Sequence, residues 1–464
     1  MGDTQRRIPL AAVILAAGKG MRMKSALAKV LHNVAGRSMI EHVLAAAGEA
    51  GTARRIVVLG QGTKEVAAAI APAEIAIQDP PLGTGHAVLA ARDLLKGFAG
   101  RVAVLFADTP LIRPENIRTI EEAMEGGAEI GVLGFRPTDP AMYGRLILGS
   151  DGSLERIVEF KDTSAAERAV TLCNSGIMIV EARHLFTLLD RVDNRNAQGE
   201  YYLPSIVAIA RAQGLRVVTA EAPAEDVLGI DNRAALAEAE GIMQRRLRTR
   251  AMLDGVTLID PETVWLSFDT KLGRDVVVGQ NVVFGPKVTV ADNVTIKPFC
   301  HFEDCSIAEG AIVGPYARLR PGAVIGRNVH IGNFVEVKKA IIEEGAKANH
   351  LSYIGDARVG ARANIGAGTI TCNYDGYDKH FTDIGADVFT GSNSALVAPL
   401  KISDGAYIGA GSVITKNVES DALVVERSEQ RQMLGWAAKF RAKKRAEKAS
   451  NKSRVGEAKT KEKL

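Results

Sequence analysis

The stretch that decides the fold is CSIAEGAIVGPYARLRPGAVIGRNVHIGNFVEV, residues 305–337. In it an aliphatic residue recurs at every sixth position, and Gly follows several of these positions directly. With occasional slips of one residue, the spacing extends over 24 positions from Leu272 to Ile414, interrupted by a loop at Cys372–Phe381. A six-residue period predicts a left-handed parallel β-helix in which the aliphatic side chains point into a stacked core. Three hexads make one triangular coil, so we expect about eight coils.

The length and composition leave room for further domains. The chain has 464 residues, of which 47% are hydrophobic and 24% charged. These values exclude a globally disordered chain and, at roughly 150 residues per domain, allow about three domains. The net charge of +4 arises in residues 437–464, which hold eleven Lys or Arg and three Glu and therefore sum to +8, leaving −4 for residues 1–436. We predict a basic, disordered tail over 437–464, and the overall charge is no evidence for a nucleic-acid partner.

Residues 1–230 alternate short apolar runs with amphipathic segments. The runs at 54–59, 101–107 and 176–180 are predicted strands, and 39–50 and 87–95 are predicted helices. This alternation indicates a Rossmann-like α/β domain with a mostly parallel sheet. Residues 231–255 are predicted to form a linking helix capped by Asp231 or Asn232, and 256–436 the β-helix domain.

The ends and the cysteines indicate a cytoplasmic protein. The four cysteines (Cys173, Cys300, Cys305 and Cys372) form no CxxC pair and no zinc-binding spacing, as expected of free thiols in a reducing compartment. The apolar start of the chain imitates a signal peptide, but a first strand leading into a Gly-rich loop explains it better. No apolar run approaches the roughly 18 residues of a membrane span. We therefore expect no membrane partner.

A candidate phosphate site follows the first strand. Gly18 and Gly20 allow backbone N–H groups to approach a polyphosphate, and Arg22 and Lys29 add positive charge. Asp108 ends the apolar run 101–107, and ligands of open α/β sheets bind at the carboxyl ends of strands. A carboxylate there can hold Mg²⁺ against phosphate oxygens, although it can also cap the helix after Pro110. Gly83-Thr84-Gly85 is placed in a polar loop that would meet a base or sugar.

The β-helix carries an unusual set of polar residues around His350. A histidine with a pKa near 7 suits the base of an acyl transfer to an amine, and Glu336 or Glu343 could orient it. A zinc site of three histidines is the alternative in a β-helix. The spacings of His301, His330, His350 and His380 argue against it.

Four stretches carry a resemblance to a known family: Gly18–Met23 with Lys29, LGTGHA at 82–87, NAQGEYY at 196–202 and ANIGAGTITCNYDG at 363–376. The first resembles sugar nucleotidyltransferases. Together with the hexads, the chain from about residue 8 to about residue 435 resembles the enzymes that combine N-acetylglucosamine-1-phosphate uridyltransferase with glucosamine-1-phosphate N-acetyltransferase. The resemblance implies acetyl transfer from acetyl-CoA to glucosamine-1-phosphate, then Mg²⁺-dependent transfer of UMP from UTP. The product, UDP-N-acetylglucosamine, would supply peptidoglycan and lipopolysaccharide.

The resemblance also implies roles for individual residues. In the first domain, the catalytic cations would be Arg22 and Lys29, the metal ligands Asp108 and Asp231, and the UTP and sugar contacts Leu15, Ala16, Ala17, Gly18, Lys29, Gln78, Gly83, Thr84, Gly144, Glu159, Asn174 and Asp231. In the second, His350 would be the catalytic base, Arg320, Lys338, Tyr353 and Asn364 would bind the amino-sugar phosphate, and Ala367, Asn373, Tyr374, Ser392, Ala410 and Arg427 would bind acetyl-CoA. The loop at Cys372–Phe381 would close a site on a neighbouring copy, which implies a homotrimer.

The second domain matches the family pattern at all these positions, whereas the first departs from it. Met21 replaces a Thr, Phe106-Ala107 replaces Tyr-Gly, and Asp231 replaces an Asn. Asp231 is an equally hard oxygen ligand with an added negative charge.

Two rival functions remain open at this point. The first is a nucleotidyltransferase that makes ADP-, dTDP- or GDP-sugars, with the β-helix as a structural rod. The second makes the basic tail a binder of nucleic acid or of a membrane surface, which a salt-dependent gel shift with and without residues 437–464 would test.

Overall fold

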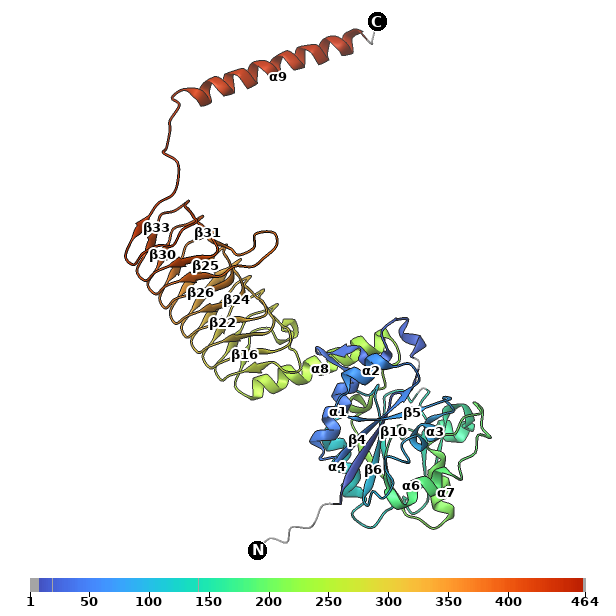
Figure 1. The fold of residues 1–464 in the computed structure, drawn as a ribbon. Coiled ribbons are helices and arrows are strands. Elements are labelled where there is room, and N and C mark those ends of the chain that lie inside the picture. Colours follow the sequence, from blue (N-terminus) through green and yellow to red (C-terminus); the bar gives the residue numbers. More distant parts are fainter. Residues whose placement is uncertain (1–7, 19, 141, 462–464) are drawn as a thin grey trace.

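The computed structural model describes residues 8–18, 20–140 and 142–461, with only the backbone from 451 onward. An α/β body and a β-helix stand at the two ends of one long helix, α8 (Arg233–Leu253) (Figure 1). This matches the predicted fold class.

The α/β body is a nine-stranded sheet with helices on both faces. The main strand order is β11 (Val217–Ala222), β7 (Ile130–Phe135), β10 (Cys173–Glu181), β6 (Arg101–Phe106), β1 (Leu10–Leu15), β4 (Arg54–Gly60) and β5 (Glu74–Gln78), with β8 (Arg145–Leu148) and β9 (Leu154–Val158) beside β10. Neighbours along this order pair in parallel except at β10, which is antiparallel to β6 and β7. A separate small hairpin pairs β2 (Asn33–Val34) with β3 (Arg37–Ser38).

Burial on both faces explains the apolar runs of the sequence. All six side chains of β1 are buried, and they alternate between two core clusters. One cluster includes α1 (Met39–Glu49), α2 (Lys64–Ala69) and α4 (Pro114–Ala123), and the other α3 (Thr84–Leu89), α6 (Ala182–Leu189) and α7 (Ser205–Ala212). A short α5 (Ala165–Arg168) lies beside β8. The continuous apolar runs are therefore those of a central sheet covered on both sides.

Two local predictions need correction. The helix expected over 87–95 is α3, which begins at Thr84 and ends at Leu89. Gly83-Thr84-Gly85 is consequently the start of a helix, with Gly83 at its N-cap position, rather than a polar loop. The tight backbone contact of this segment with Tyr201 fixes the helix start, and no local sequence pattern reveals it.

The sequence offered two candidate N-caps for the linking helix, Asp231 and Asn232, and the structure distinguishes them. The Asn232 side-chain oxygen accepts from the backbone N–H groups of Ala234 and Ala235, at 2.9 and 3.0 Å. Asn232 is thus the cap, and Asp231 is left for other contacts. Gln244 in the helix ties it to the β-helix, since its amide exchanges two hydrogen bonds with the backbone of Leu266.

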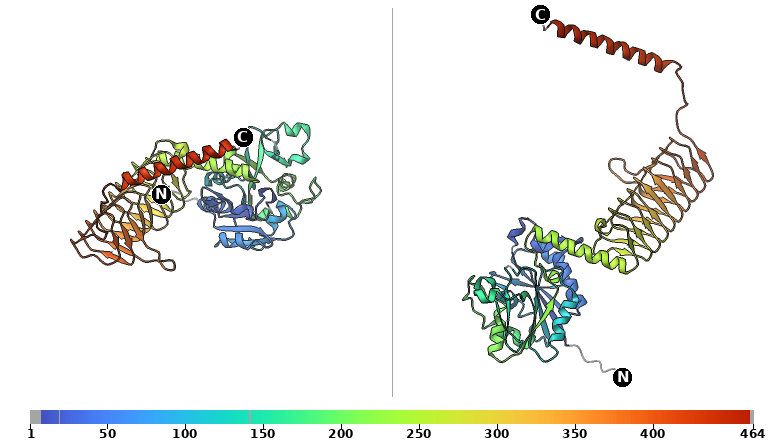
Figure 2. Two further views of the ribbon diagram at one scale, coloured as in Figure 1. Left: turned by 90° about the horizontal axis from the view of Figure 1, so that it is seen from above. Right: turned by 180° about the vertical axis from the view of Figure 1, so that it is seen from behind.

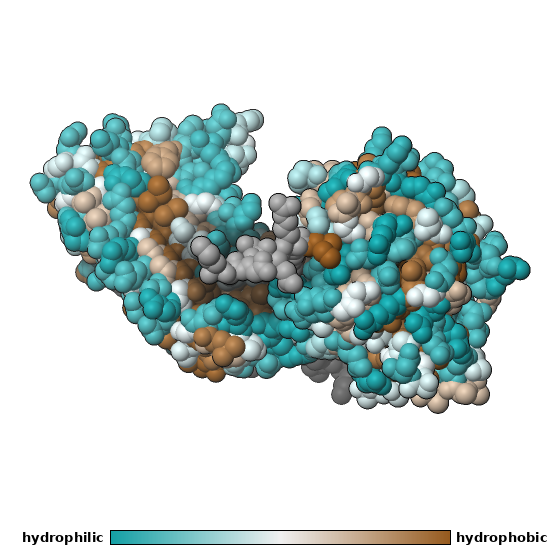
Figure 3. All heavy atoms as spheres, turned by 90° about the horizontal axis from the view of Figure 1, so that it is seen from below, coloured by the Kyte–Doolittle hydropathy of each residue, from teal (hydrophilic) through white to brown (hydrophobic). Residues whose placement is uncertain are grey.

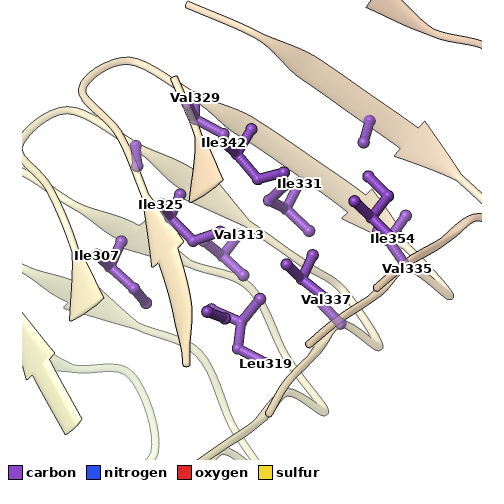
Figure 4. Close-up of a cluster of buried hydrophobic side chains, with 14 of the residues drawn as sticks. Ile307, Val313, Leu319, Ile325, Val329, Ile331, Val335, Val337, Ile342 and Ile354 are labelled. Carbon is purple, nitrogen blue, oxygen red and sulfur yellow. The ribbon is translucent and has the colours of Figure 1, made fainter. Parts of the chain in front are cut away.

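The hexad prediction is confirmed, because all 24 anchor positions are buried except Leu272, which is partly buried. Figure 4 shows the resulting stack, in which Ile307, Ile325 and Ile342 follow one another from coil to coil. One face of the β-helix is β12 (Thr257–Leu258), β14 (Val277–Val278), β17 (Thr295–Ile296), β20 (Ile312–Val313), β23 (His330–Asn333), β25 (Lys347–His350), β27 (Asn364–Ile365), β30 (Phe389–Thr390), β33 (Tyr407–Ile408) and β35 (Leu423–Val424).

The other two faces are joined because β24 (Glu336–Ile342) and β26 (Tyr353–Val359) continue around a corner. The second face is β15 (Val283–Phe284), β18 (His301–Phe302), β21 (Arg318–Leu319), β24, β26, β28 (Ile370–Cys372), β31 (Ala395–Val397) and β34 (Val413–Ile414). The third is β13 (Lys271–Leu272), β16 (Val288–Val290), β19 (Cys305–Ile307), β22 (Ala323–Ile325), β24, β26, β29 (Thr382–Ile384) and β32 (Leu400–Ile402).

The expectation of a tail without secondary structure is wrong over the described residues. A helix, α9 (Trp436–Lys461), extends away from the rest of the molecule (Figure 2). Ala, Lys, Arg and Glu favour helix, and this outweighs the lack of a packing partner. Every side chain described in α9 is exposed, as a segment without an apolar stripe requires. Residues 462–464 lie outside the described residues.

Among the helices of the described residues, none combines the length and the apolar character needed to cross a membrane.

Candidate functional site

A cavity of about 360 Å³ opens at the carboxyl edge of the α/β sheet, where β1, β4 and β5 end. Of the residues predicted to contact the nucleotide, those in its lining are Ala16, Ala17, Gly18, Lys29 and Gln78. The Gln78 side-chain amide donates to the Gly83 carbonyl at 3.0 Å, which joins the cavity wall to the start of α3.

Lys29 is the electrostatic centre of this site. Its Nζ lies 2.5 Å from Asp108 Oδ2 and 2.6 Å from Asp231 Oδ1. Arg22 approaches the other oxygen of Asp231 at 3.0 Å. Burial by itself would lower the pKa of Lys29, but the two carboxylates outweigh it and raise the pKa above the ordinary value. The structure therefore brings together two cations and two carboxylates that lie up to 209 positions apart in the sequence, from Arg22 to Asp231.

Backbone contacts hold these groups in place. Gly20 has a φ of 59°, and a Cβ there would lie 2.4 Å from the Lys29 Cβ, so the loop folds against Lys29 only with glycine at this position. The Ile230 N–H donates to the Asp108 carbonyl at 2.9 Å, which sets Asp231 beside Asp108. Helix α4 begins only at Pro114, so the capping role considered for Asp108 is excluded.

The NAQGEYY stretch anchors the Gly83 and Thr84 positions. The Gly85 N–H donates to the Tyr201 carbonyl at 2.8 Å, and the Leu203 N–H donates to Thr84 Oγ1 at 3.0 Å. A Cβ on Gly83 would lie 2.7 Å from the Tyr201 carbonyl oxygen. The Thr84 hydroxyl oxygen is thus already bonded to the backbone of Leu203. A contact of Thr84 with a ligand would use the hydroxyl hydrogen, the second lone pair of the oxygen or the backbone of Thr84.

The three predicted sugar residues meet at one place. The Asn174 N–H donates to the Gly144 carbonyl at 2.9 Å, and a Cβ on Gly144 would lie 3.4 Å from a Glu159 carboxylate oxygen. Burial, reinforced by the charge of Asp162, raises the pKa of Glu159 above its ordinary value. A half-buried carboxylate is suited to accept hydrogen bonds from sugar hydroxyls.

The structure shows the surroundings of three residues that depart from the family pattern: Met21, Phe106 and Ala107. Met21 is 82% exposed and contributes nothing to the cavity lining. Phe106 packs on Gly176, where a Cβ would lie 2.7 Å from the ring, and Ala107 is fully buried with its N–H donating to the Leu15 carbonyl. The Ala107 methyl is therefore accommodated in the core.

The candidate metal ligands of the α/β body are the pair Asp108 and Asp231. Within the described ranges no group of three or more His, Cys, Asp or Glu side chains converges to hold a metal ion. Asp108 and Asp231 form a pair around one shared cationic position, and two carboxylates completed by substrate phosphate and water are a common arrangement for Mg²⁺.

A second polar cluster lies on the β-helix around Lys338. Arg320 donates to Glu336 at 2.7 Å, and Lys338 lies on the neighbouring coil. The pKa of Lys338 is lowered first by the charge of Lys379 and then by that of Arg320. Three cations without an equal number of carboxylates suit a phosphate group. Lys379, which comes from the loop between β28 and β29, was not found from the sequence, because the hexad pattern is interrupted there.

His350 has a partner that the sequence analysis missed. Its Nδ1 lies 2.6 Å from Asn333 Oδ1, one coil away in the same face. The expected partners are engaged elsewhere, since Glu336 pairs with Arg320 and Glu343 with Arg358 at 3.1 Å. The offset of 17 residues between the anchors Ile331 and Ala348 is the signal that aligns Asn333 with His350.

Three of the predicted acetyl-CoA residues, Ala367, Ser392 and Ala410, form a column on the same corner. Backbone contacts run upward from His350: the Gly368 N–H donates to the His350 carbonyl, that of Asn393 to Ala367, and that of Gly411 to Ser392. The Arg427 side chain donates to the Ala410 carbonyl at 2.8 Å. His350, Ala367, Ser392 and Ala410 therefore follow one another from coil to coil.

The remaining predicted residues do not all face the same way. Tyr353 begins β26 on the second face, whereas Asn364 begins β27 on the first. Asn373 donates to Asp356, and the exposed Tyr374 donates to the Gly376 carbonyl within a loop that projects from the β-helix (Figure 1). One chain thus presents the predicted acetyltransferase residues on two faces and one loop.

Comparisons with known proteins match the α/β body and the β-helix to two different families. Residues 12–171 match the family of MobA-like NTP transferase domains, and residues 304–339 match the bacterial transferase hexapeptide family of six repeats. Over 442 residues, 95% of this chain and 98% of the relative, the sequence is 54% identical to "Bifunctional protein GlmU" of Paramagnetospirillum magneticum. Proteins of the same name from Azorhizobium caulinodans and Zymomonas mobilis are 54% and 49% identical over 93% and 94% of this chain, and over 97% and 98% of their own lengths.

Proposed function

The chain belongs to the family of bifunctional GlmU proteins and makes UDP-N-acetylglucosamine in two steps, for which we propose the residues that follow. The α/β body carries the uridyltransferase and the β-helix the acetyltransferase. The observation that supports this division best is the coexistence of two separate polar sites, one around Lys29 and one around His350.

In uridyl transfer, a phosphate oxygen of N-acetylglucosamine-1-phosphate attacks the α-phosphorus of UTP, and pyrophosphate leaves. Lys29 and Arg22 neutralise phosphate charge, which is the main requirement of such a transfer. The nucleotide binds in the cavity at the end of β1 against Ala16, Ala17, Gly18 and Gln78, and its further contacts are with Leu15, Gly83 and Thr84 outside the cavity lining. Gly144, Glu159 and Asn174 bind the sugar, with Glu159 ionised and accepting from its hydroxyls.

Mg²⁺ is the proposed metal of this step. Asp108 and Asp231 are the ligands that the chain offers, and both already face one cation, the Lys29 ammonium, within 2.6 Å. When bound, Mg²⁺ supplies further neutralisation of the phosphate oxygens. The chain's own contribution is to hold the two carboxylates together through the backbone bond between Ile230 and Asp108.

In acetyl transfer, the amine of glucosamine-1-phosphate attacks the thioester carbonyl of acetyl-CoA, and the thiolate of CoA leaves. His350 takes the proton that the amine loses as the new N–C bond forms. Arg320 and Lys338 bind the sugar phosphate, and Lys379 joins them. Tyr353 and Asn364 complete the sugar contacts, and Ala367, Asn373, Tyr374, Ser392, Ala410 and Arg427 bind acetyl-CoA.

A homotrimer assembled through the β-helix is part of the proposal. Tyr353 and Asn364 lie on different faces of one chain, so a complete site needs the faces of two copies to meet. The exposed rings of Phe299, Tyr316 and Phe334 stack along one corner at centroid distances of 4.9 and 5.0 Å. Figure 3 shows hydrophobic patches among the hydrophilic side chains of the β-helix, as expected where another subunit packs.

The cytoplasm is the proposed location, and the product would supply peptidoglycan and lipopolysaccharide. All four cysteines are free, and burial raises the pKa of Cys300 to about 11 and that of Cys305 to about 12. Such thiols are unreactive structural groups, in keeping with a reducing compartment.

Two substitutions separate the two steps. His350→Ala should abolish CoA release from acetyl-CoA and glucosamine-1-phosphate, while pyrophosphate release from UTP and N-acetylglucosamine-1-phosphate remains. Asp108→Ala should have the reverse effect. Acetylation at the wild-type rate by His350→Ala would exclude this residue as the base, and unchanged Mg²⁺-dependent pyrophosphate release by Asp108→Ala would exclude the metal site. A wild-type chain that uses ATP, dTTP or GTP in preference to UTP would favour the other nucleotidyltransferases.

A further inference from the structure

Asn333, whose side chain contacts His350, has been given no role in the proposed acetyl transfer. Asn333 ends β23 and is in register with His350 at the end of β25, with 2.6 Å between Asn333 Oδ1 and His350 Nδ1. The inference that follows rests on the proposed role of His350 as the base of acetyl transfer.

The backbone around His350 is held on both sides. From below, the Leu351 N–H donates to the Asn333 carbonyl at 3.0 Å. From above, the Gly368 N–H donates to the His350 carbonyl at 3.2 Å, and Ser352 Oγ donates to the same oxygen at 2.9 Å. The backbone of the base is therefore fixed by three bonds, and its ring is fixed by Asn333.

The chemistry of the two groups determines which nitrogen is free. When the amide oxygen of Asn333 accepts, Nδ1 of His350 carries the hydrogen, and Nε2 keeps its lone pair. A base for acetyl transfer needs such a free nitrogen directed at the amine of the substrate. Without this partner, the ring could rotate about its side-chain bonds and exchange tautomers, and only a fraction of molecules would be ready to react.

We propose that Asn333 is a positioning residue of the acetyltransferase, which holds the imidazole of His350 in the orientation and tautomer that leave Nε2 free to accept the proton of the amine. Asn333 itself touches neither substrate nor reacting atoms.

The neutrality of Asn333 is part of this role. A carboxylate at the same position would stabilise the imidazolium, so that Nε2 would already be protonated near neutral pH. The titratable groups on the flanking strands are His330 on β23 and Lys347 on β25, while β27 contains none. Burial, then the charges of Lys297 and Lys347, lowers the pKa of His330, which favours its neutral form. Asn333 thus orients the base without adding charge to it.

The test compares Asn333→Ala and Asn333→Asp with the wild-type full-length protein over pH 5.5–9.5, with CoA release as the readout. For Asn333→Ala we expect kcat to fall by about 10- to 100-fold, less than most of the roughly 10²- to 10⁴-fold that a general base contributes because His350 itself remains, with the KM for glucosamine-1-phosphate unchanged. For Asn333→Asp we expect the acidic limb of kcat to move up by about one pH unit, with activity approaching the wild-type value above that limb. The substrate amine titrates equally in all three proteins, so the difference between profiles reports the enzyme.

Uridyltransferase activity and the elution volume of each variant serve as controls for folding and assembly. A kcat of Asn333→Ala within twofold of wild type, or an Asn333→Asp profile that superimposes on the wild-type profile, would overturn the proposal. If the wild-type protein released no CoA at all, or if His350→Ala remained active, the proposed function would fail instead, so the two failures are distinguishable.

Discussion

The replacement of Gly332 by Ala tests whether the spacing between coils controls acetyl transfer. Gly332 lies in β23 directly before Asn333, opposite the coil that carries His350. A Cβ built on Gly332 would lie 1.8 Å from the Asn349 carbonyl oxygen, and the next nearest atoms are also Asn349 backbone. The φ of Gly332 is not in the left-handed region, so the contact with this backbone is the whole obstacle.

The geometry sets the size of the effect. Ordinary contacts of a Cβ begin at 3.4 Å, so the two coils must separate by about 1.6 Å at this step. If both share the movement, His350 is displaced by close to 1 Å from the substrate amine. Misplacement of that size costs about 100-fold in rate, and we expect a loss of about 10- to 100-fold in kcat of CoA release.

Gly285→Ala is the matched control, since Gly285 also follows an anchor of the hexad pattern. There the nearest atom to an added Cβ is the Phe302 carbonyl oxygen at 3.1 Å, which needs a shift of only a few tenths of an ångström. We expect Gly285→Ala to keep acetyltransferase activity within about twofold, and both variants to keep wild-type uridyltransferase activity. Equal acetyltransferase activity of the two variants would refute the reasoning, because the coil spacing at Gly332 would then have no influence on the base.

Three further predictions concern the α/β body. Burial and the charge of Asp162 raise the pKa of Glu159 above 4.5, the ordinary value for glutamate. As the pH is lowered, Glu159 therefore gains its proton at a pH above 4.5, and kcat/KM for N-acetylglucosamine-1-phosphate should fall there. Glu159→Gln should lower kcat/KM about tenfold and remove this acidic limb from the pH profile. Asp231→Asn should raise the Mg²⁺ concentration at half-maximal uridyl transfer about tenfold and reduce the Mg²⁺-induced rise in melting temperature; an unchanged Mg²⁺ dependence in both measurements would remove Asp231 from the metal site. Asp226, which is fully buried, pairs with Arg113 and Arg246 at 2.6 Å each, so Asp226→Ala should lower the free energy of unfolding by about 3–5 kcal/mol in urea titrations. The exposed pair of Glu115 and Arg118 is the control, for which Glu115→Ala should cost less than about 1 kcal/mol, and similar costs for the two variants would contradict the argument from burial.

The β-helix could be predicted from sequence because its information is local. Each hexad anchor is set by neighbours within one or two turns of the coil, and only Leu272, at the open end of the stack, is incompletely buried. The tail was misjudged for the opposite reason. The absence of an apolar stripe correctly predicted a solvated segment, since the α9 side chains that the structure describes are exposed, but helix propensity alone produced the helix.

The two sites show where sequence reasoning reaches its limit. Lys29 and Asp108 were identified from their immediate surroundings and Asp231 from the family resemblance, yet nothing local indicated that one ammonium lies between the two carboxylates. Asn333 was missed although the anchor spacing defines its register with His350, because Glu336 and Glu343 were preferred as charged partners. Both glutamates are occupied by arginines of adjacent coils, and such pairings depend on the full three-dimensional stack.

The start of α8 connects the catalytic chemistry to the domain boundary. Asn232 caps the helix, and this frees Asp231, one residue earlier, to face Lys29 and Arg22. A boundary drawn after residue 230 would therefore assign Asp231, a proposed ligand of the first site, to the linker. Farther along the same helix, Arg246 reaches the buried Asp226 of the α/β body, and Gln244 bonds the first coil of the β-helix at Leu266. The linking helix is thus bonded to both domains: it begins beside the cluster of Lys29 and Asp108, and its middle contacts the α/β body through Arg246 and the β-helix through Gln244.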